Sequence, residues 1–256
     1  YLADTAWELF HRPALHEAQQ YLDDRSAKGF TVIQAVVLAE FAGLVEPNPN
    51  GDLPLSGNDP TKPNEAYFKH VDQIVDYAAS RGLVIGMLPT WGDKWNKKWG
   101  MGPEIFTPEN ALIYGRFIGK RYADKPIIWI LGGDRPIEND THMAIIRAMA
   151  KGIKEGDGGK HLMTFHTWGG SSASHWLHNE SWYDFNMWQT GHDRNRPSWE
   201  LIGRDYDRSP AKPVLDGEPG YEDHAAGFNM DNGYLDDYDA RKSLYWSLFA
   251  GSSGHT

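Results

Sequence analysis

The stretches FTVIQAVVL, residues 30–38, and LVIGMLP, residues 83–89, are the clearest indication of the fold class of this protein. Both are short, rich in apolar residues and apolar on both faces, which is the pattern of strands buried in a parallel sheet. Between them, residues 64–80 place apolar side chains at helical spacing, and Gly82 follows as a helix-ending glycine. Strand, helix and strand in this order form one βαβ unit, so a parallel α/β fold is predicted.

The same alternation continues along the whole chain of 256 residues. Further strands are expected at residues 1–5, 127–131, 162–165, 184–188 and 213–215, with an eighth beginning near Gly254. Further helices are expected at residues 15–28, from 108 onward after the capping residue Thr107, and at 141–154, 198–206 and 237–249. One eight-stranded barrel takes about 250 residues. The sequence therefore predicts a single domain over residues 1–256, an α/β fold of the (β/α)8 TIM type that is truncated near strand eight.

The composition excludes several kinds of partner. Lys and Arg number 25 against 35 Asp and Glu, and the formal charge of −10 has the wrong sign for a nucleic-acid binder. The longest apolar runs, such as residues 31–39, are too short to cross a bilayer, so no membrane insertion is expected. The chain has no cysteine, and its histidines lack metal-binding helical spacing, so neither a metal nor a cofactor is expected. The oligomeric state stays open.

Two carboxyl groups stand where a barrel of this kind has its active site, directly after the strands. Asp134 lies in GGDRP after the fourth expected strand, and Glu218 lies in DGEP after the seventh. These two strands lie on opposite sides of an eight-stranded barrel, so their tips can face each other. Glycoside hydrolysis needs such a pair, because one carboxyl group protonates the leaving oxygen and the other attacks the sugar or activates water. A single acidic residue at a strand end is more often a helix cap or ion-pair partner, so the prediction rests on the pair.

Aromatic residues support a carbohydrate site. The chain has eleven Trp, twelve Tyr and ten Phe, more than a plain core needs, and part of them will form the core. The residues predicted to hold sugar hydroxyls are Asp4, Glu40, His166 and Gln189, and those predicted to form aromatic walls are Trp7, Trp91, Trp168 and Trp188. Lys94, Lys97 and Lys98 are interpreted either as a basic spot for an acidic polysaccharide or as a solvated surface loop.

Six segments together resemble the apiosidase-like family of bacterial glycoside hydrolases, glycoside hydrolase family 140. They are LADTAWELFHR (2–12), SAKGFTVIQAVVLAE (26–40), PTWGDKW (89–95), WILGGDRP (129–136), FHTWGG (165–170) and VLDGEPGYE (214–222). The resemblance covers essentially the whole chain. It implies an (α/β)8 barrel that acts on apiose-linked side chains of the pectin rhamnogalacturonan II, with the catalytic carboxylates Asp134 and Glu218.

Members of this family usually carry an export signal before the barrel and a small β-sandwich after it. The sequence shows neither, so the expected domain is the barrel alone, and an extracellular or periplasmic location is expected from the resemblance.

The expected function is a pectin-directed O-glycosyl hydrolase in which Asp134 is the general acid and Glu218 is the nucleophile or base. One alternative is a barrel glycosidase for another sugar, such as an arabinofuranoside. Another is a non-catalytic carbohydrate-binding barrel that uses the same residues. A polysaccharide or oligosaccharide is the expected partner in each case. Retention and inversion both stay open, because they depend on whether the carboxyl groups are about 5–5.5 or about 6.5–9.5 Å apart.

Overall fold

The computed structural model describes residues 1–256, which form two compact parts. One part consists of residues 4–163, and the other of residues 1–3 with residues 164–256. No helix in either part has the length and apolar character that crossing a membrane requires.

Residues 4–163 form successive βα units. The strands are β1 (Ala3–Thr5), β2 (Val32–Leu38), β3 (Val84–Thr90) and β4 (Ile127–Gly132), and the helices are α1 (Leu15–Ala27), α2 (Glu65–Ser80), α3 (Pro108–Arg121) and α4 (Asp140–Asp157). Two pairings are parallel: Val32 of β2 lies opposite Val84 of β3, and Ile85 of β3 lies opposite Ile127 of β4. The two stretches quoted first are therefore neighbouring strands, as predicted, and all seven residues of β2 are buried.

Local chemistry sets where these helices begin. The side chain of Asn64 accepts a hydrogen bond from the Ala66 N–H at the start of α2, and Thr107 caps α3 just before Pro108. Both caps satisfy backbone donors that a helix start leaves without partners. The observed helices in this part begin within one residue of the predicted positions.

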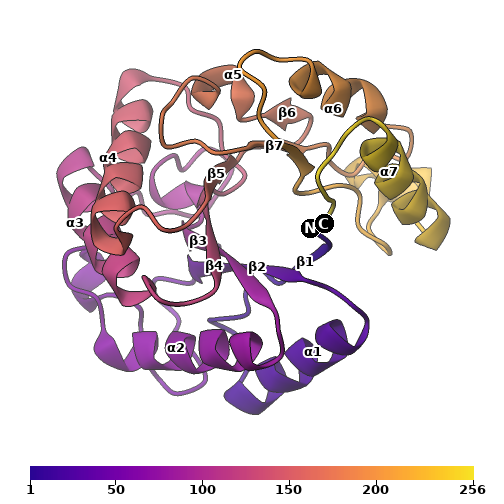
Figure 1. Ribbon diagram of the computed structural model, residues 1–256. Coiled ribbons are helices and arrows are strands. Elements are labelled where there is room, and N and C mark those ends of the chain that lie inside the picture. The colour runs from indigo at the N-terminus through magenta and orange to yellow at the C-terminus, as the bar shows by residue number, and fades with distance from the viewer. The chain divides into compact units, whose positions relative to one another are not determined.

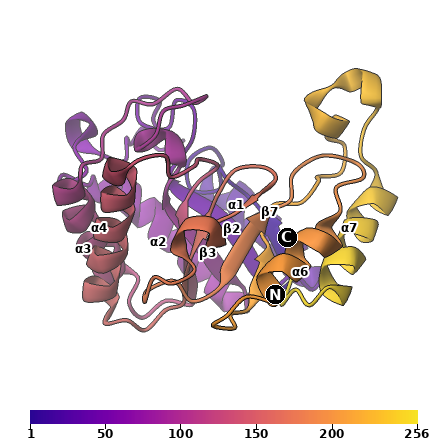
Figure 2. The same cartoon turned by 90° about the horizontal axis from the view of Figure 1, so that it is seen from above.

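Helices α3 and α4 run side by side, as both views show (Figures 1 and 2). Their close approach depends on glycine. A Cβ atom on Gly115 would lie 2.6 Å from the Met149 carbonyl oxygen, and one on Gly152 would lie 2.4 Å from the Leu112 carbonyl oxygen. Any larger residue at these positions would have to push the two helices apart.

The second part contains β5 (Met163–His166), which starts at the boundary residue, then β6 (Ser171–Ser172), β7 (Asn186–Gln189) and β8 (Val214–Asp216), with helices α5 (Ser174–Leu177), α6 (Ser198–Tyr206) and α7 (Asp237–Phe249). Strands β7 and β8 pair in parallel, whereas β6 pairs antiparallel with β7. Neither β6 nor α5 was predicted, since two and four residues are too short to show a period.

The predicted eighth strand near Gly254 corresponds to a single residue. His255 forms parallel bridges with Leu2 and with Asp216, so it lies between the start of the chain and β8. The segment between β8 and α7, drawn in gold in Figure 2, carries two short 3-10 turns, Ala226–Phe228 and Met230–Asn232.

Candidate active site

Glu218 is the buried acidic centre of the part that holds residues 164–256. It lies two residues beyond the end of β8, and only 6% of its surface is exposed. His166, at the end of β5, places Nε2 2.8 Å from Oε2 of Glu218, and His192 places Nε2 3.4 Å from Oε1. The structure thus brings the predicted residues His166 and Glu218 together.

The two imidazoles decide the ionisation of Glu218. Burial alone would raise its pKa, but the hydrogen bonds and the electrostatic interaction with His166 and His192 lower the pKa to about 2. Nearby Asp216 shows the opposite balance: burial raises its pKa to about 7, although Thr190 and Ser247 donate hydrogen bonds to it. Of the two acids at the end of β8, Glu218 is therefore the one held as a carboxylate.

An aromatic cluster adjoins this carboxylate. The ring of His192 lies 4.3 Å from that of His224, 4.7 Å from that of Tyr221 and 5.3 Å from that of Phe228. Phe228 is 77% exposed, so the cluster reaches from the buried acid to the surface. Rings of this kind provide flat apolar faces beside polar groups.

In residues 4–163, a tight backbone turn after β4 holds Asp134. Gly132, Gly133 and Asp134 have φ values of 93°, 105° and 53°. A Cβ atom on Gly133 would lie 2.7 Å from the backbone nitrogen of Gly92, whose N–H donates to the Gly133 oxygen at 2.9 Å. A left-handed conformation is uncommon for residues other than glycine, and strain of this kind concentrates at functional sites.

Two donors fix the side chain of Asp134. Its Oδ2 accepts a hydrogen bond from Nε1 of Trp99 at 3.0 Å and one from Nη1 of Arg135 at 2.8 Å. Arg135 is fully buried, and its guanidinium carbon lies 4.9 Å from the centre of the Trp99 ring. Trp99 itself is 54% exposed, so a surface tryptophan and a buried arginine hold the half-buried carboxylate.

Glu40 belongs to the same cluster. Its Oε1 lies 3.9 Å from Nη2 of Arg135. Partial burial raises the pKa of Glu40 to about 7; Arg135 opposes this shift, whereas the negative charges of Asp134 and Asp93 add to it. Glu40 therefore exchanges its proton near neutral pH, as an acid–base group in a site does.

Three further side chains in the part with residues 4–163 were predicted to contact sugar, and in the structure they contact other side chains of the protein. Asp4 accepts a hydrogen bond from Tyr21 at 2.8 Å and pairs with Arg25 at 2.6 Å. The rings of Trp7 and Trp91 lie 5.1 Å apart, and Trp91 is buried. The predicted sugar contacts of Asp4, Trp7 and Trp91 stay predictions.

The placement of Lys94 on the surface is wrong. Its side chain is fully buried, with Nζ 2.9 Å from Oδ2 of the equally buried Asp93 and 3.3 Å from the carbonyl oxygen of Gly102. An ion pair taken out of water must be fully hydrogen-bonded, and these contacts supply partners for the ammonium group. Lys94 therefore stabilises the loop after β3 from inside the protein. It belongs neither to a basic surface spot nor to a solvated loop.

The remaining predicted contact residues lie in the part with residues 164–256. Trp188 is buried in a core cluster with Leu201, Ile202 and Val214, which is typical of a packing residue. Trp168 is half-buried, with its ring 5.4 Å from that of Trp176, and Gln189 is buried at the end of β7. Their predicted sugar contacts stay predictions.

Sequence reasoning missed the partners of the two carboxylates, Arg135 and His192. Both stand just after expected strands, so their position was a usable signal. What the sequence lacked was any indication that their side chains turn toward an acid. No group of three or more His, Asp or Glu side chains is arranged to hold a metal ion.

Comparison with known proteins supplies the family. The model of the family described as "Apiosidase-like, catalytic domain" matches residues 1–256. A glycoside hydrolase family 5 protein from Bacteroides vulgatus is 32% identical with a TM-score of 0.89, covering 100% of this chain and 57% of the other. Another structure, described as "Glycoside hydrolase", is 34% identical with a TM-score of 0.88, covering 100% of this chain and 60% of the other. No curated protein matches.

The chain thus spans about three fifths of the length of these two proteins. An endo-β-1,4-mannanase from Thermotoga petrophila shares the fold at 14% identity, with a TM-score of 0.70, covering 100% of this chain and 66% of the other. The likeness over the whole chain confirms the predicted fold class, a (β/α)8 barrel of the TIM type. With its family model matched from the first residue to the last, the chain belongs to the apiosidase-like catalytic-domain family.

Proposed function

We propose that the protein is a glycoside hydrolase that removes apiose-linked side chains from rhamnogalacturonan II, with Asp134 as general acid and Glu218 as nucleophile or base. The observation that carries the proposal is the surroundings of Glu218. It is a buried carboxylate held ionised by two imidazoles, directly after a barrel strand. A nucleophile or base of a glycosidase must carry its negative charge at the working pH.

The surroundings of Asp134 suit the carboxylate that the acid becomes once its proton has left. The donors Trp99 and Arg135 both contact Oδ2 of Asp134. Once that proton has passed to the leaving oxygen, the new negative charge lies 2.8 Å from the Arg135 guanidinium. Stabilisation of charge that develops during the reaction is a major source of catalysis.

Membership in the apiosidase-like family supports apiose as the sugar, and the resemblance to exported family members supports an extracellular or periplasmic location. The similar family 5 structure supports glycoside hydrolysis in general. Fractionation of the producing cells would test the location.

The test of the activity is sugar release from rhamnogalacturonan II, followed by anion-exchange chromatography. We expect Glu218→Gln to lower turnover at least ~1000-fold, since the reacting carboxylate is gone. Asp134→Asn should fail on the polysaccharide yet keep activity on an apioside with a dinitrophenolate leaving group, which needs no protonation. Glu200→Gln, an exposed change on α6, is the matched control and should be fully active.

Each outcome separates the proposal from its rivals. Release of arabinose from arabinofuranosides but nothing from rhamnogalacturonan II would move the enzyme to another substrate. Binding of polysaccharide without turnover, and without any effect of Asp134→Asn, would identify a binding protein. Full activity of Glu218→Gln would remove Glu218 from the mechanism.

A further inference from the structure

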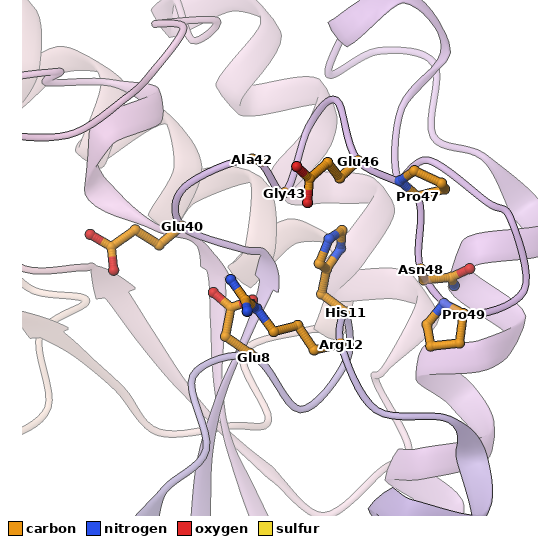
Figure 3. A pocket seen from close by; sticks show the side chains of 10 residues that line it. All are labelled: Glu8, His11, Arg12, Glu40, Ala42, Gly43, Glu46, Pro47, Asn48 and Pro49. Atoms are coloured by element: carbon orange, nitrogen blue, oxygen red, sulfur yellow. The ribbon is translucent and has the colours of Figure 1, made fainter.

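A cavity of about 290 Å³ lies in residues 4–163 between the loops that follow β1 and β2 (Figure 3). Its polar lining consists of Glu8, His11, Arg12, Glu40, Glu46 and Asn48. Glu40 also belongs to the cluster of Asp134 and Arg135, so the cavity adjoins the proposed acid. Ligand pockets usually begin at about 300 Å³, so this one suits a single small unit rather than a chain of sugars.

Two buried side chains of this cavity have polar atoms without a hydrogen-bond partner. His11 and Asn48 are 6% and 3% exposed, and His11 Nδ1 and Asn48 Nδ2 bond to nothing in the protein. The amide orientation of Asn48 is set, since its Oδ1 accepts the N–H groups of Asn50 and Asp52, both at 3.0 Å. Buried polar atoms nearly always have a hydrogen-bond partner, so the hydroxyl groups of a ligand would supply the partners that His11 Nδ1 and Asn48 Nδ2 lack.

The charges of the lining disfavour an anionic ligand. Arg12 is occupied by Glu8 at 2.8 Å, whereas Glu46 is exposed and no cation pairs with its carboxylate. Burial lowers the pKa of His11, so its imidazole is neutral at neutral pH and can donate or accept a hydrogen bond. Sugar hydroxyls can donate to Glu46 and accept from the Asn48 amide. The carboxylate of a uronate would instead meet the negative charge of Glu46.

We propose that this cavity is a subsite that takes one neutral sugar unit of the substrate and rejects a uronate. The subsite rests on the proposed function, which it deepens by naming the kind of sugar that lies beside the acid. Glu46 is its specificity-determining residue, because it carries the lining's exposed carboxylate that no cation neutralises.

Monosaccharide binding tests the subsite without turnover. Arabinose, galactose and galacturonate are titrated into the protein while long-range ¹H–¹⁵N NMR spectra report the ring nitrogens of His11. We expect the neutral sugars to shift the His11 signals, and galacturonate to bind at least ~10-fold more weakly. Glu46→Gln should reduce the difference in affinity between the neutral sugars and galacturonate, and Glu46→Lys should make galacturonate the tighter ligand. Glu200→Gln, also an exposed glutamate, should leave it unchanged.

The subsite would be overturned if galacturonate bound as tightly as the neutral sugars, or if Glu46→Lys left the preference for neutral sugars unchanged. It would also be overturned if no sugar bound, or if bound sugars left the His11 signals unshifted. The two proposals fail separately. Hydrolysis of rhamnogalacturonan II without sugar-dependent shifts of the His11 signals would reject the subsite and leave the proposed activity intact. Shifts of the His11 signals without hydrolysis would reject the proposed activity and leave the sugar-binding site intact.

Discussion

Replacing Glu40 by glutamine should stabilise the protein at alkaline pH and leave its stability at acid pH unchanged. The folded structure raises the pKa of Glu40 from 4.5 to about 7, chiefly by burial. Because the folded protein holds the proton of Glu40 more tightly than the unfolded chain does, the free energy of unfolding falls as the pH rises. The contribution of the protonated carboxyl group is fully present below pH 4.5 and is lost as the pH rises through about 7. Glutamine resembles the protonated acid in shape and never acquires the charge, so the variant escapes that loss.

The size of the effect follows from the same values. The difference of about 2.5 between the two pKa values, at about 1.36 kcal/mol for each unit, sets a ceiling of about 3 kcal/mol. The Glu40 side chain keeps 23% of its surface in solvent, so we expect a gain of about 1–3 kcal/mol at pH 8.5. At pH 4.5 the gain should be close to zero.

Urea unfolding of the parent and the Glu40→Gln variant at pH 4.5, 6, 7 and 8.5 measures this difference directly. Glu200→Gln on α6 is the control, and its small effect, about 0.5 kcal/mol or less, should be the same from pH 6 to 8.5. A Glu40→Gln variant that is less stable than the parent at pH 8.5 would refute the argument, because burial would then not dominate the charge of Arg135. A gain independent of pH would refute it as well.

Three further predictions concern the two carboxylates. Gly133→Ala should destabilise the protein by about 1–3 kcal/mol in thermal unfolding and lower activity, since its Cβ atom would meet the Gly92 nitrogen at 2.7 Å; an unchanged Tm would contradict the close approach. Trp99→Phe removes the hydrogen bond to Asp134 and keeps a ring, so kcat/KM should fall about 10-fold without loss of stability; unaltered kinetics would show that this bond is dispensable. Glu218→Gln should lower the free energy of unfolding by about 1–3 kcal/mol above pH 5. The difference from the parent should disappear as the pH falls from 4.5 to about 2, because the lowered pKa stabilises the fold only while Glu218 is ionised. A constant difference in urea unfolding across pH 2–7 would argue against stabilisation by the imidazoles.

Much of the fold could be predicted from local patterns. The parallel strands β2 and β3 and the cap at Thr107 appear where apolar runs and a capping residue indicated them. Strand β6 escaped prediction, because two residues carry no period and the pairing of β6 with β7 depends on residues far along the chain. Lys94 was misjudged for a related reason, since a lysine in a loop normally stays in water unless a partner such as Asp93 is buried with it.

Local patterns in the sequence were enough to predict the order of strands and helices and the positions of Asp134 and Glu218 at strand ends, because apolar periodicity, glycine and helix caps act over a few residues. The way in which these acids are held depends on tertiary contacts. The pKa of Glu218 depends on His166 and His192, and that of Glu40 on burial and on Arg135. Burial and charge act through space, and the residues that supply them stand far apart in the chain.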